Sequence, residues 1–372
     1  MMGPVRILHV HSTFTLGGKE ARAIRLMNAF GNAARHTVIS ATGALDAREA
    51  ISEDVKVAFP DDHPPIVGKP ALRRYRALAH YMSRFDLVLT YNWGSMDAVG
   101  ARRLFGGPPL VHHEDGFNQD EVDRQKLARV LFRWLMLPAA RHVVVPSHTL
   151  ERIARETWKQ PVSRVVRIAN GIPLPSRSAV AIPGFEPRKG ELVVGTIAGL
   201  RAVKNIPRLV RAFAAGAPET ARLLVMGEGP ERTTVMAEAE RLGIAGRVLL
   251  PGFVSEPARA IRHCAIFALS SDSEQQPISL IEAMAASLPA VSTDVGDVRA
   301  MVASDNVPFI VPAADEAGFA SAIRTLAANP DLRGRIGAAN YRKATTNFAE
   351  SAMISTYRAL YAGAIGRRGA FG

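Results

Sequence analysis

Short apolar runs alternate with longer segments of helical periodicity along nearly the whole sequence. Each apolar run is three to five residues long, as expected of a buried strand: 6–10, 37–40, 87–90, 110–112, 143–145, 193–197, 223–226, 248–250, 266–269 and 290–292. Between them, apolar residues recur with helical spacing over 19–30, 70–83, 206–215, 232–242 and 256–263. Because a strand–helix–strand crossover is almost always right-handed, this alternation predicts an α/β protein with parallel sheets covered by helices.

A proline-rich stretch divides the chain near its middle. Residues 172–190, IPLPSRSAVAIPGFEPRKG, show no apolar periodicity and are interpreted as a linker. A length of 372 residues accommodates two domains of ordinary size. We therefore predict one Rossmann-like domain over 1–175, a second over 176–345, and a C-terminal helical region over 346–372. The helix of that region is predicted to run without a break over 339–364.

The composition excludes several classes of protein. A hydrophobic content of 48% with 22% charged residues is typical of a folded globular chain. The single cysteine, Cys264, excludes a disulfide framework and a multi-cysteine metal site. No apolar run is long enough to span a bilayer and the N-terminus shows no signal peptide, so we expect a cytoplasmic protein. No P-loop, HExxH or DxD pattern occurs, and we expect neither a metal ion nor a resident cofactor.

A net charge of +12 indicates an anionic partner or a strongly basic surface. Basic residues are concentrated in the first half, where Arg124, Lys126, Arg129 and Arg133 share one predicted helix with several apolar residues. We favour a solvated basic face above a buried apolar stripe. The alternative is a peripheral contact with anionic lipid at the inner face of the plasma membrane. Nucleic acid is not an expected partner, because no motif for binding it is present.

The most informative single segment is 270–296, SSDSEQQPISLIEAMAASLPAVSTDVG. A buried strand ends in a polar turn, and Pro277 then suits the first position of a helix. Glu274 precedes this helix, and Glu282 lies off its buried stripe, on a side that faces a surface or a cleft. The free N–H groups at Ile278 and Ser279 suit a phosphate. Two acids that flank an anion site predict a ligand built from a sugar, a diphosphate and a ribose.

This segment resembles the E-x7-E element of retaining GT-B glycosyltransferases of family 4, and EAMAASLPAVSTDVG is close to the family's EAMAAGxPVVxTxxGG. The resemblance implies two Rossmann-like domains whose parallel sheets face across a cleft, with a final helix that crosses back to the first domain. It also implies that Glu282 holds the ribose hydroxyls and that Glu274 contacts the donor sugar as a catalytic residue. The donor would be a nucleotide diphosphate sugar, and its anomeric configuration would be retained.

A second donor-binding element opens the second domain as GTIAGLRAVKN. Family 4 enzymes typically read G-R-L-x-x-x-K-[GN] here and clamp the diphosphate with the Arg and the Lys. Lys204 matches the Lys, but Gly199 stands at the position of the Arg. Either Arg201 substitutes from a shifted position, or phosphate binding rests mainly on Lys204.

Two segments of the first domain match further family elements. Gly17 and Gly18 lie in a turn after the first strand that matches the GG-x-E loop, which implies that they approach the donor phosphates. The fourth predicted strand ends in HHED, and we assign His113 as the catalytic residue that contacts a hydroxyl near the reacting carbon. The family histidine occurs at slightly different offsets, so His112 and Asp115 remain alternatives.

The predicted activity is hexosyl transfer from a nucleotide sugar to a saccharide or lipid-linked acceptor, in cell-surface polysaccharide biosynthesis. Two alternatives stay open. A GT-B-fold sugar-nucleotide epimerase would use the same donor site and need no acceptor. A catalytically degenerate protein would bind the sugar nucleotide and transfer nothing, which the Gly199 departure favours.

Overall fold

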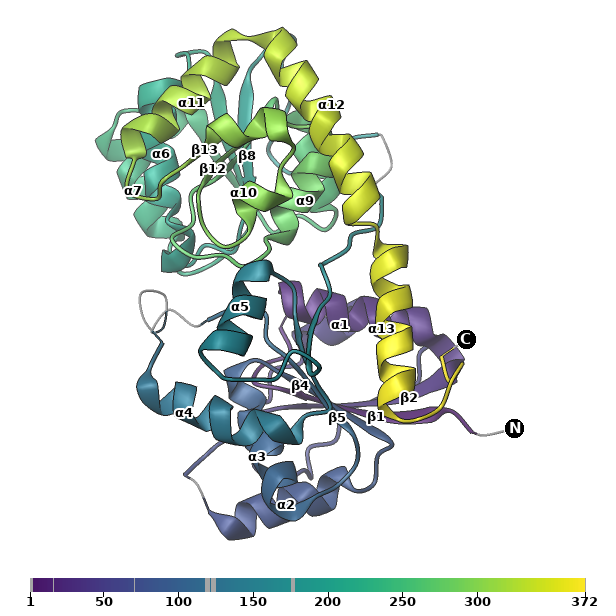
Figure 1. The fold of residues 1–372 in the computed structure, drawn as a ribbon. Coiled ribbons are helices and arrows are strands. Elements are labelled where there is room, and N and C mark those ends of the chain that lie inside the picture. Colours follow the sequence, from purple (N-terminus) through teal and green to yellow (C-terminus); the bar gives the residue numbers. More distant parts are fainter. Residues whose placement is uncertain are drawn as a thin grey trace. The chain divides into compact units, whose positions relative to one another are not determined.

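The computed structural model describes residues 3–15, 17–69, 71–117, 121, 125–174 and 178–371 (Figure 1). It divides into two compact units. The first unit contains Met1–Asn170 and Ser351–Gly372, and the second contains Gly171–Glu350. The chain therefore passes from the first unit to the second at Asn170, five residues before the predicted boundary, and returns at Glu350.

The first unit is built on a seven-stranded parallel sheet with the order β3-β2-β1-β4-β5-β6-β7. Its strands are β1 (Val5–His11), β2 (Ala34–Ser40), β3 (Val57–Ala58), β4 (Leu87–Tyr91), β5 (Leu110–His113), β6 (His142–Val145) and β7 (Val165–Arg167). The sequence did not predict β3 and β7. They are two and three residues long and lie at the two edges of the sheet, so neither forms the long buried apolar run by which a central strand is recognised.

Helices cover both faces of this sheet. One core packs α1 (Gly18–Phe30) and α13 (Glu350–Ala364) against the strands. The opposite core contains residues of four helices, α2 (Leu72–Met82), α3 (Met96–Phe105), α4 (Leu127–Met136) and α5 (His148–Glu156). Figure 1 shows α2, α3 and α4 together on the side of the sheet away from α1.

The predicted continuous helix over 339–364 is wrong, because two helices occupy this region. Helix α12 (Pro330–Asn347) belongs to the second unit and ends before Phe348, whose φ of −128° and ψ of 28° are not helical. Phe348 accepts a hydrogen bond from Ile172 N (3.0 Å), and Ile172 O accepts one from Glu350 N (3.0 Å). Helix α13 then packs its aromatic residues into the core of the first unit. The expectation of a final helix that crosses back to the first domain is confirmed.

The second unit is built on a six-stranded parallel sheet with the order β10-β9-β8-β11-β12-β13. Its strands are β8 (Val193–Ile197), β9 (Arg222–Met226), β10 (Val248–Gly252), β11 (Ile266–Leu269), β12 (Ala290–Thr293) and β13 (Ile310–Val311). Its remaining helices are α6 (Ile206–Gly216), α7 (Arg232–Arg241), α8 (Pro257–Ala260), α9 (Ile278–Ala285), α10 (Val298–Met301) and α11 (Glu316–Ala328). Two Rossmann-like domains with parallel sheets are therefore present, as predicted.

Candidate functional site

The loops that follow β8 and β11 form the candidate donor site of the second unit. These strands are parallel neighbours, so their carboxyl ends emerge at the same edge of the sheet. The loops are joined by hydrogen bonds from Asp272 N to Val203 O (2.8 Å) and from Ser270 Oγ to Lys204 O (3.0 Å). Asn205 donates its side-chain amide to the Asp272 carboxylate, and caps α6 through Arg208 N. The two loops therefore form one hydrogen-bonded framework.

Lys204 and Glu274 meet at the surface of this framework. The Lys204 Nζ lies 2.5 Å from Glu274 Oε1, and Ser271 Oγ donates to the same oxygen over 2.8 Å. The Lys204 and Glu274 side chains are only 17% and 10% exposed. The structure thus brings together two predicted site residues that lie 70 positions apart in the chain. Sequence reasoning missed Ser271 and Asp272, although both lie in the same motif.

Arg201 lies next to the position that the family's Arg would occupy. Its side chain is exposed, and its Nε lies 3.8 Å from the point where a β-carbon on Gly199 would stand. A side chain at position 199 would therefore start in the space beside the Arg201 guanidinium. This geometry favours substitution from a shifted position over a site that rests on Lys204 alone.

The helix start is placed one residue later than predicted. Pro277 has ψ of 120° and precedes the helix, which begins at Ile278. Ile278 and Ser279 therefore supply the first N–H groups of α9, as the prediction of an anion site requires. Glu282 is only 8% exposed, whereas its position off the apolar stripe predicted a more exposed side chain. Every residue of α9 from Leu280 to Ala285 is buried, so all sides of this part of the helix are covered.

Gly296 lets a third loop approach the framework. Its φ of +56° lies in the left-handed region, and a β-carbon there would stand 2.3 Å from Glu274 O. Nearby, Asp297 N donates to Gln275 O over 3.0 Å, and Thr293 Oγ1 donates to Ser271 O over 2.6 Å. The end of β12 and the loop after it therefore contact the backbone on both sides of Glu274.

We expect Gly296→Ala to destabilise the second unit by at least about 2 kcal/mol, because it combines an unfavourable φ with a clash against backbone. Thermal unfolding measures the loss, and any donor that binds this loop should bind the variant more weakly. Gly246→Ala is the matched control, since Gly246 has no positive φ and no atom within 4 Å of the added carbon. Equal melting temperatures for the two variants would contradict the prediction.

The strand ends of the first unit enclose a buried cluster of histidines and tyrosines. His9 Nε2 lies 3.0 Å from His36 Nδ1, and His9 Nδ1 lies 3.0 Å from Tyr91 OH. His113 Nδ1 donates to Thr90 O (3.1 Å), and its Nε2 lies 2.8 Å from Tyr361 OH. His113 is 1% exposed. Both of its nitrogens have protein partners, so a contact between His113 and substrate would require Nε2 to exchange its bond with Tyr361.

The two alternative positions differ in their environment. His112 is fully buried, with Nδ1 2.9 Å from Thr90 Oγ1. Asp115 is the most open of the three, with a side chain 14% exposed, and it forms a two-point ion pair with Arg22. Burial alone would raise the pKa of Asp115, but the Arg22 guanidinium outweighs burial and lowers it. Arg22 also donates to Asn170 over 3.1 Å. Of the three candidates, Asp115 is therefore the most exposed, although Arg22 engages both of its carboxylate oxygens.

The glycine turn precedes α1 as predicted. Gly17 is extended, with φ of −148°, and Gly18 is the first residue of the helix. A β-carbon on Gly17 would stand 3.0 Å from Glu20 Oε2. Burial raises the pKa of Glu20, although Lys19 pairs with it. The structure therefore places the turn beside the Glu20 carboxylate. Leu16 of the same turn and Arg124 of the predicted basic helix lie outside the described residues.

The buried histidines predict that the first unit loses stability in acid. Burial lowers the pKa of His36 to about 4 and of His113 to about 3, and it lowers those of His9 and His11 well below 6.5. Below pH 6.5 the unfolded chain takes up protons that the folded chain does not, so stability falls as the pH decreases. Each histidine contributes roughly 1.4 kcal/mol per pH unit in this window.

Urea unfolding followed by tryptophan fluorescence measures this effect, because all three tryptophans lie in the first unit. The urea midpoint should be clearly lower at pH 5 than at pH 7.5. An unchanged midpoint would show that these histidines take up protons in the folded protein as readily as in the unfolded chain.

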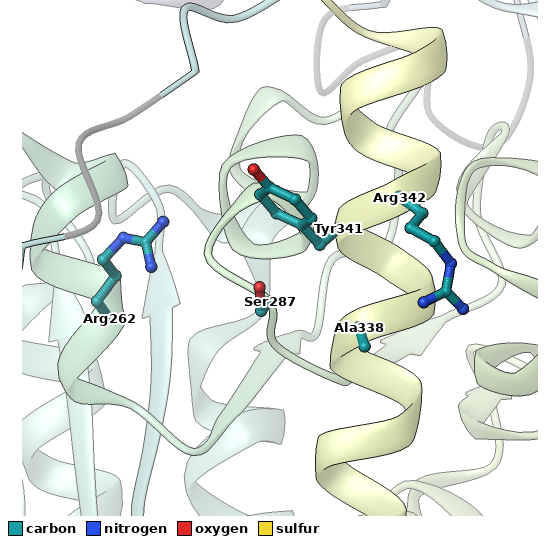
Figure 2. Close-up of a pocket in the computed structure, with 5 residues that line it drawn as sticks. All are labelled: Arg262, Ser287, Ala338, Tyr341 and Arg342. Carbon is teal, nitrogen blue, oxygen red and sulfur yellow. The ribbon is translucent and has the colours of Figure 1, made fainter.

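A surface pocket of about 340 Å³ lies elsewhere in the second unit. Its lining is Arg262, Ser287, Ala338, Tyr341 and Arg342, and Figure 2 shows the last three of these projecting from α12. It shares no residue with the predicted donor site. Within the described residues, no group of three His, Cys, Asp or Glu side chains could hold a metal ion.

Comparison with known proteins identifies the family. The family model for Glycosyltransferase Family 4 matches residues 5–175, and that for Glycosyl transferases group 1 matches residues 181–343. N-acetyl-alpha-D-glucosaminyl L-malate synthase of Bacillus anthracis is 27% identical over 174 residues, 46% of each chain. The lipopolysaccharide core biosynthesis glycosyltransferase LpsD of Rhizobium meliloti is 26% identical over 220 residues, 59% of each chain. The chain thus spans about half the length of the curated relatives it matches.

Solved structures share the fold over almost the whole chain. HepE of Anabaena aligns with a TM-score of 0.78 at 17% identity, covering 96% of this chain and 100% of HepE. Sucrose-phosphate synthase from Thermosynechococcus elongatus aligns with a TM-score of 0.77 at 18% identity, covering 96% of this chain and 100% of the synthase. Because the two family models match the two units in turn and the architecture agrees, the chain belongs to glycosyltransferase family 4 and has the GT-B fold.

Proposed function

We propose that this protein transfers a hexose from a nucleotide diphosphate sugar to a saccharide or lipid-linked acceptor, with retention of configuration. The observation that carries the proposal is the Lys204–Glu274 pair, which lies at adjoining strand ends just before the N-terminus of α9. A cation, a helix N-terminus and a carboxylate in one framework match the diphosphate and the sugar of such a donor. HepE, which shares the fold, was solved with UDP and with UDP-glucose.

The roles follow from charge. In the reaction, the bond between the anomeric carbon and the phosphate oxygen breaks, and the acceptor oxygen bonds to the same face of that carbon. The acceptor proton passes to the departing phosphate. Lys204, Arg201 and the N–H groups of Ile278 and Ser279 would stabilise the negative charge that develops on the diphosphate. No step assigned here requires a metal ion or another resident cofactor.

The two carboxylates would then position the donor. Glu282 would hold the ribose hydroxyls. Glu274 would exchange its contact with Lys204 for a sugar hydroxyl when the diphosphate takes the lysine. The ion pair with Glu274 keeps the lysine oriented toward the place where the phosphate would bind, which reduces the ordering needed on binding.

The relatives support the choice of acceptor class and of process. Their names include a lipopolysaccharide core glycosyltransferase and the putative glycosyltransferase EpsD of Bacillus subtilis, which is 28% identical over 176 residues. We therefore assign the reaction to cell-surface polysaccharide biosynthesis.

A thermal-shift screen of UDP-, GDP- and ADP-linked hexoses tests the donor site. A donor at a thousand times its Kd should stabilise the second unit by about 4 kcal/mol. Nucleotide release from the best donor, measured with and without oligosaccharide or polyprenyl-diphosphate-sugar acceptors, then tests transfer. Release that depends on acceptor supports a transferase. Release or epimerisation without acceptor, or no stabilisation by any nucleotide sugar, would overturn the proposal.

A further inference from the structure

Helix α4 has an inverted polarity: Arg133 faces the protein interior, and three leucines face solvent. Arg133 is fully buried, and its Nε donates to Glu114 Oε2 over 3.2 Å. Its guanidinium carbon lies 4.8 Å from the centre of the Trp158 ring and 5.0 Å from that of Trp93. Arg129 also turns inward, to pair with Glu121 over 2.8 Å. The prediction of a solvated basic face above a buried apolar stripe is therefore wrong.

The outer face of α4 is apolar. Leu127, Leu131, Trp134 and Leu135 are 72%, 52%, 47% and 44% exposed. Their spacing of four, three and one residues places them along one side of the helix. Burying an arginine while exposing four large apolar side chains is unfavourable in water, and a contiguous patch of this kind marks an interaction surface.

The helices that pack beside α4 also carry exposed apolar side chains. A β-carbon on Gly100 of α3 would contact Phe132 (3.5 Å) and Met136 (3.7 Å) of α4, so the two helices pack directly. Among the described residues, eleven large apolar side chains are exposed, and seven of them lie on α2, α3 and α4. The same helices carry three exposed arginines: Arg73, Arg76 and Arg103.

The charge of the protein is concentrated in the unit that carries this surface. The first unit has 27 Lys and Arg against 16 Asp and Glu, whereas the second has 19 against 18. A second copy of this chain would present the same positive unit and would be repelled. An anionic surface with an apolar interior complements both the arginines and the leucines.

We propose that the outer face of α4 docks on an anionic lipid bilayer. Leu127, Leu131, Trp134 and Leu135 enter the boundary between headgroups and acyl chains, while the arginines of α2 and α3 contact lipid phosphates. No helix in the described part of the chain is long and apolar enough to cross a membrane. This inference does not depend on the reaction proposed above.

Vesicle binding by the full chain tests the proposal. Vesicles of phosphatidylcholine with 30% phosphatidylglycerol should bind the protein in flotation assays, and pure phosphatidylcholine should bind it far less. Trp134 is the exposed tryptophan, because Trp158 is fully buried and Trp93 is partly buried, so its emission should shift to the blue on binding. Binding should weaken in high salt, because the arginine contribution is screened.

The variant Leu131→Gln/Leu135→Gln should lower the vesicle partition coefficient at least tenfold without changing the melting temperature, because both side chains are exposed. Val162→Gln is the matched control, since Val162 is 67% exposed elsewhere in the first unit. Failure of the parent to bind anionic vesicles, or equal binding by the double variant, would overturn the proposal. So would a dimer in sedimentation velocity that the double variant dissociates, since the occupant would then be a second copy.

Discussion

Lys204→Ala should lower kcat/KM for the donor by roughly 100-fold or more, about 2.7 kcal/mol of transition-state stabilisation. Each hydrogen bond from a charged group to the diphosphate contributes about 1.5–3 kcal/mol. The substitution also removes the cation that pairs with Glu274 over 2.5 Å, which leaves that carboxylate close to an incoming dianion. Loss of attraction and gain of repulsion act together, and steady-state kinetics with the donor from the thermal-shift screen measure their sum.

Two further variants separate binding from chemistry. Glu274→Gln keeps an oxygen that can accept from Ser271, so the loop should remain folded and the Kd for the donor should change little while kcat falls. Lys189→Ala is the control, because Lys189 is an exposed lysine of the same unit outside the site. A Lys204→Ala enzyme within threefold of the parent would contradict the assignment of Lys204 to the diphosphate.

Much of the second unit could be predicted from sequence because its strands, turns and helix starts are determined by residues that are neighbours in the chain. Strand, turn and helix follow one another within 270–296, and the helix start at Ile278 depends only on neighbouring residues. That Lys204 and Glu274 meet follows from topology, since parallel neighbouring strands end at one edge. The hydrogen bonds of Asn205 and Asp272 could not be predicted, because they depend on side-chain geometry in two loops at once.

The first unit was less predictable because its candidate site residues form hydrogen bonds with residues far away in the sequence. His113 Nε2 is hydrogen-bonded to the Tyr361 hydroxyl, 248 positions later in the chain. No residue near His113 in the sequence indicates this contact. The buried face of α4 was predicted wrongly for a related reason. Periodicity shows that apolar and basic residues segregate, but the side that faces the core was decided by Glu114, Glu121 and two tryptophan rings outside the helix.

Arg133→Met should destabilise the first unit by about 3–5 kcal/mol, although methionine is the more apolar side chain. Glu114 is fully buried and accepts from Arg133 Nε, so the substitution leaves a buried carboxylate without its cation. The guanidinium also loses its contacts with the rings of Trp93 and Trp158. A change of this size lowers the melting temperature of a unit of this length by roughly 10 °C, which calorimetry or fluorescence measures.

The double variant Arg133→Met/Glu114→Gln distinguishes an uncompensated charge from lost packing. If the buried carboxylate causes the loss, removing its charge should recover a substantial part of the melting temperature, and the two substitutions will not be additive. Arg103→Met, on the exposed end of α3, should stay within about 0.5 kcal/mol of the parent. An Arg133→Met protein as stable as the parent would mean that Arg133 does not hold α4 in its inverted orientation, and the apolar outer face would then need another explanation.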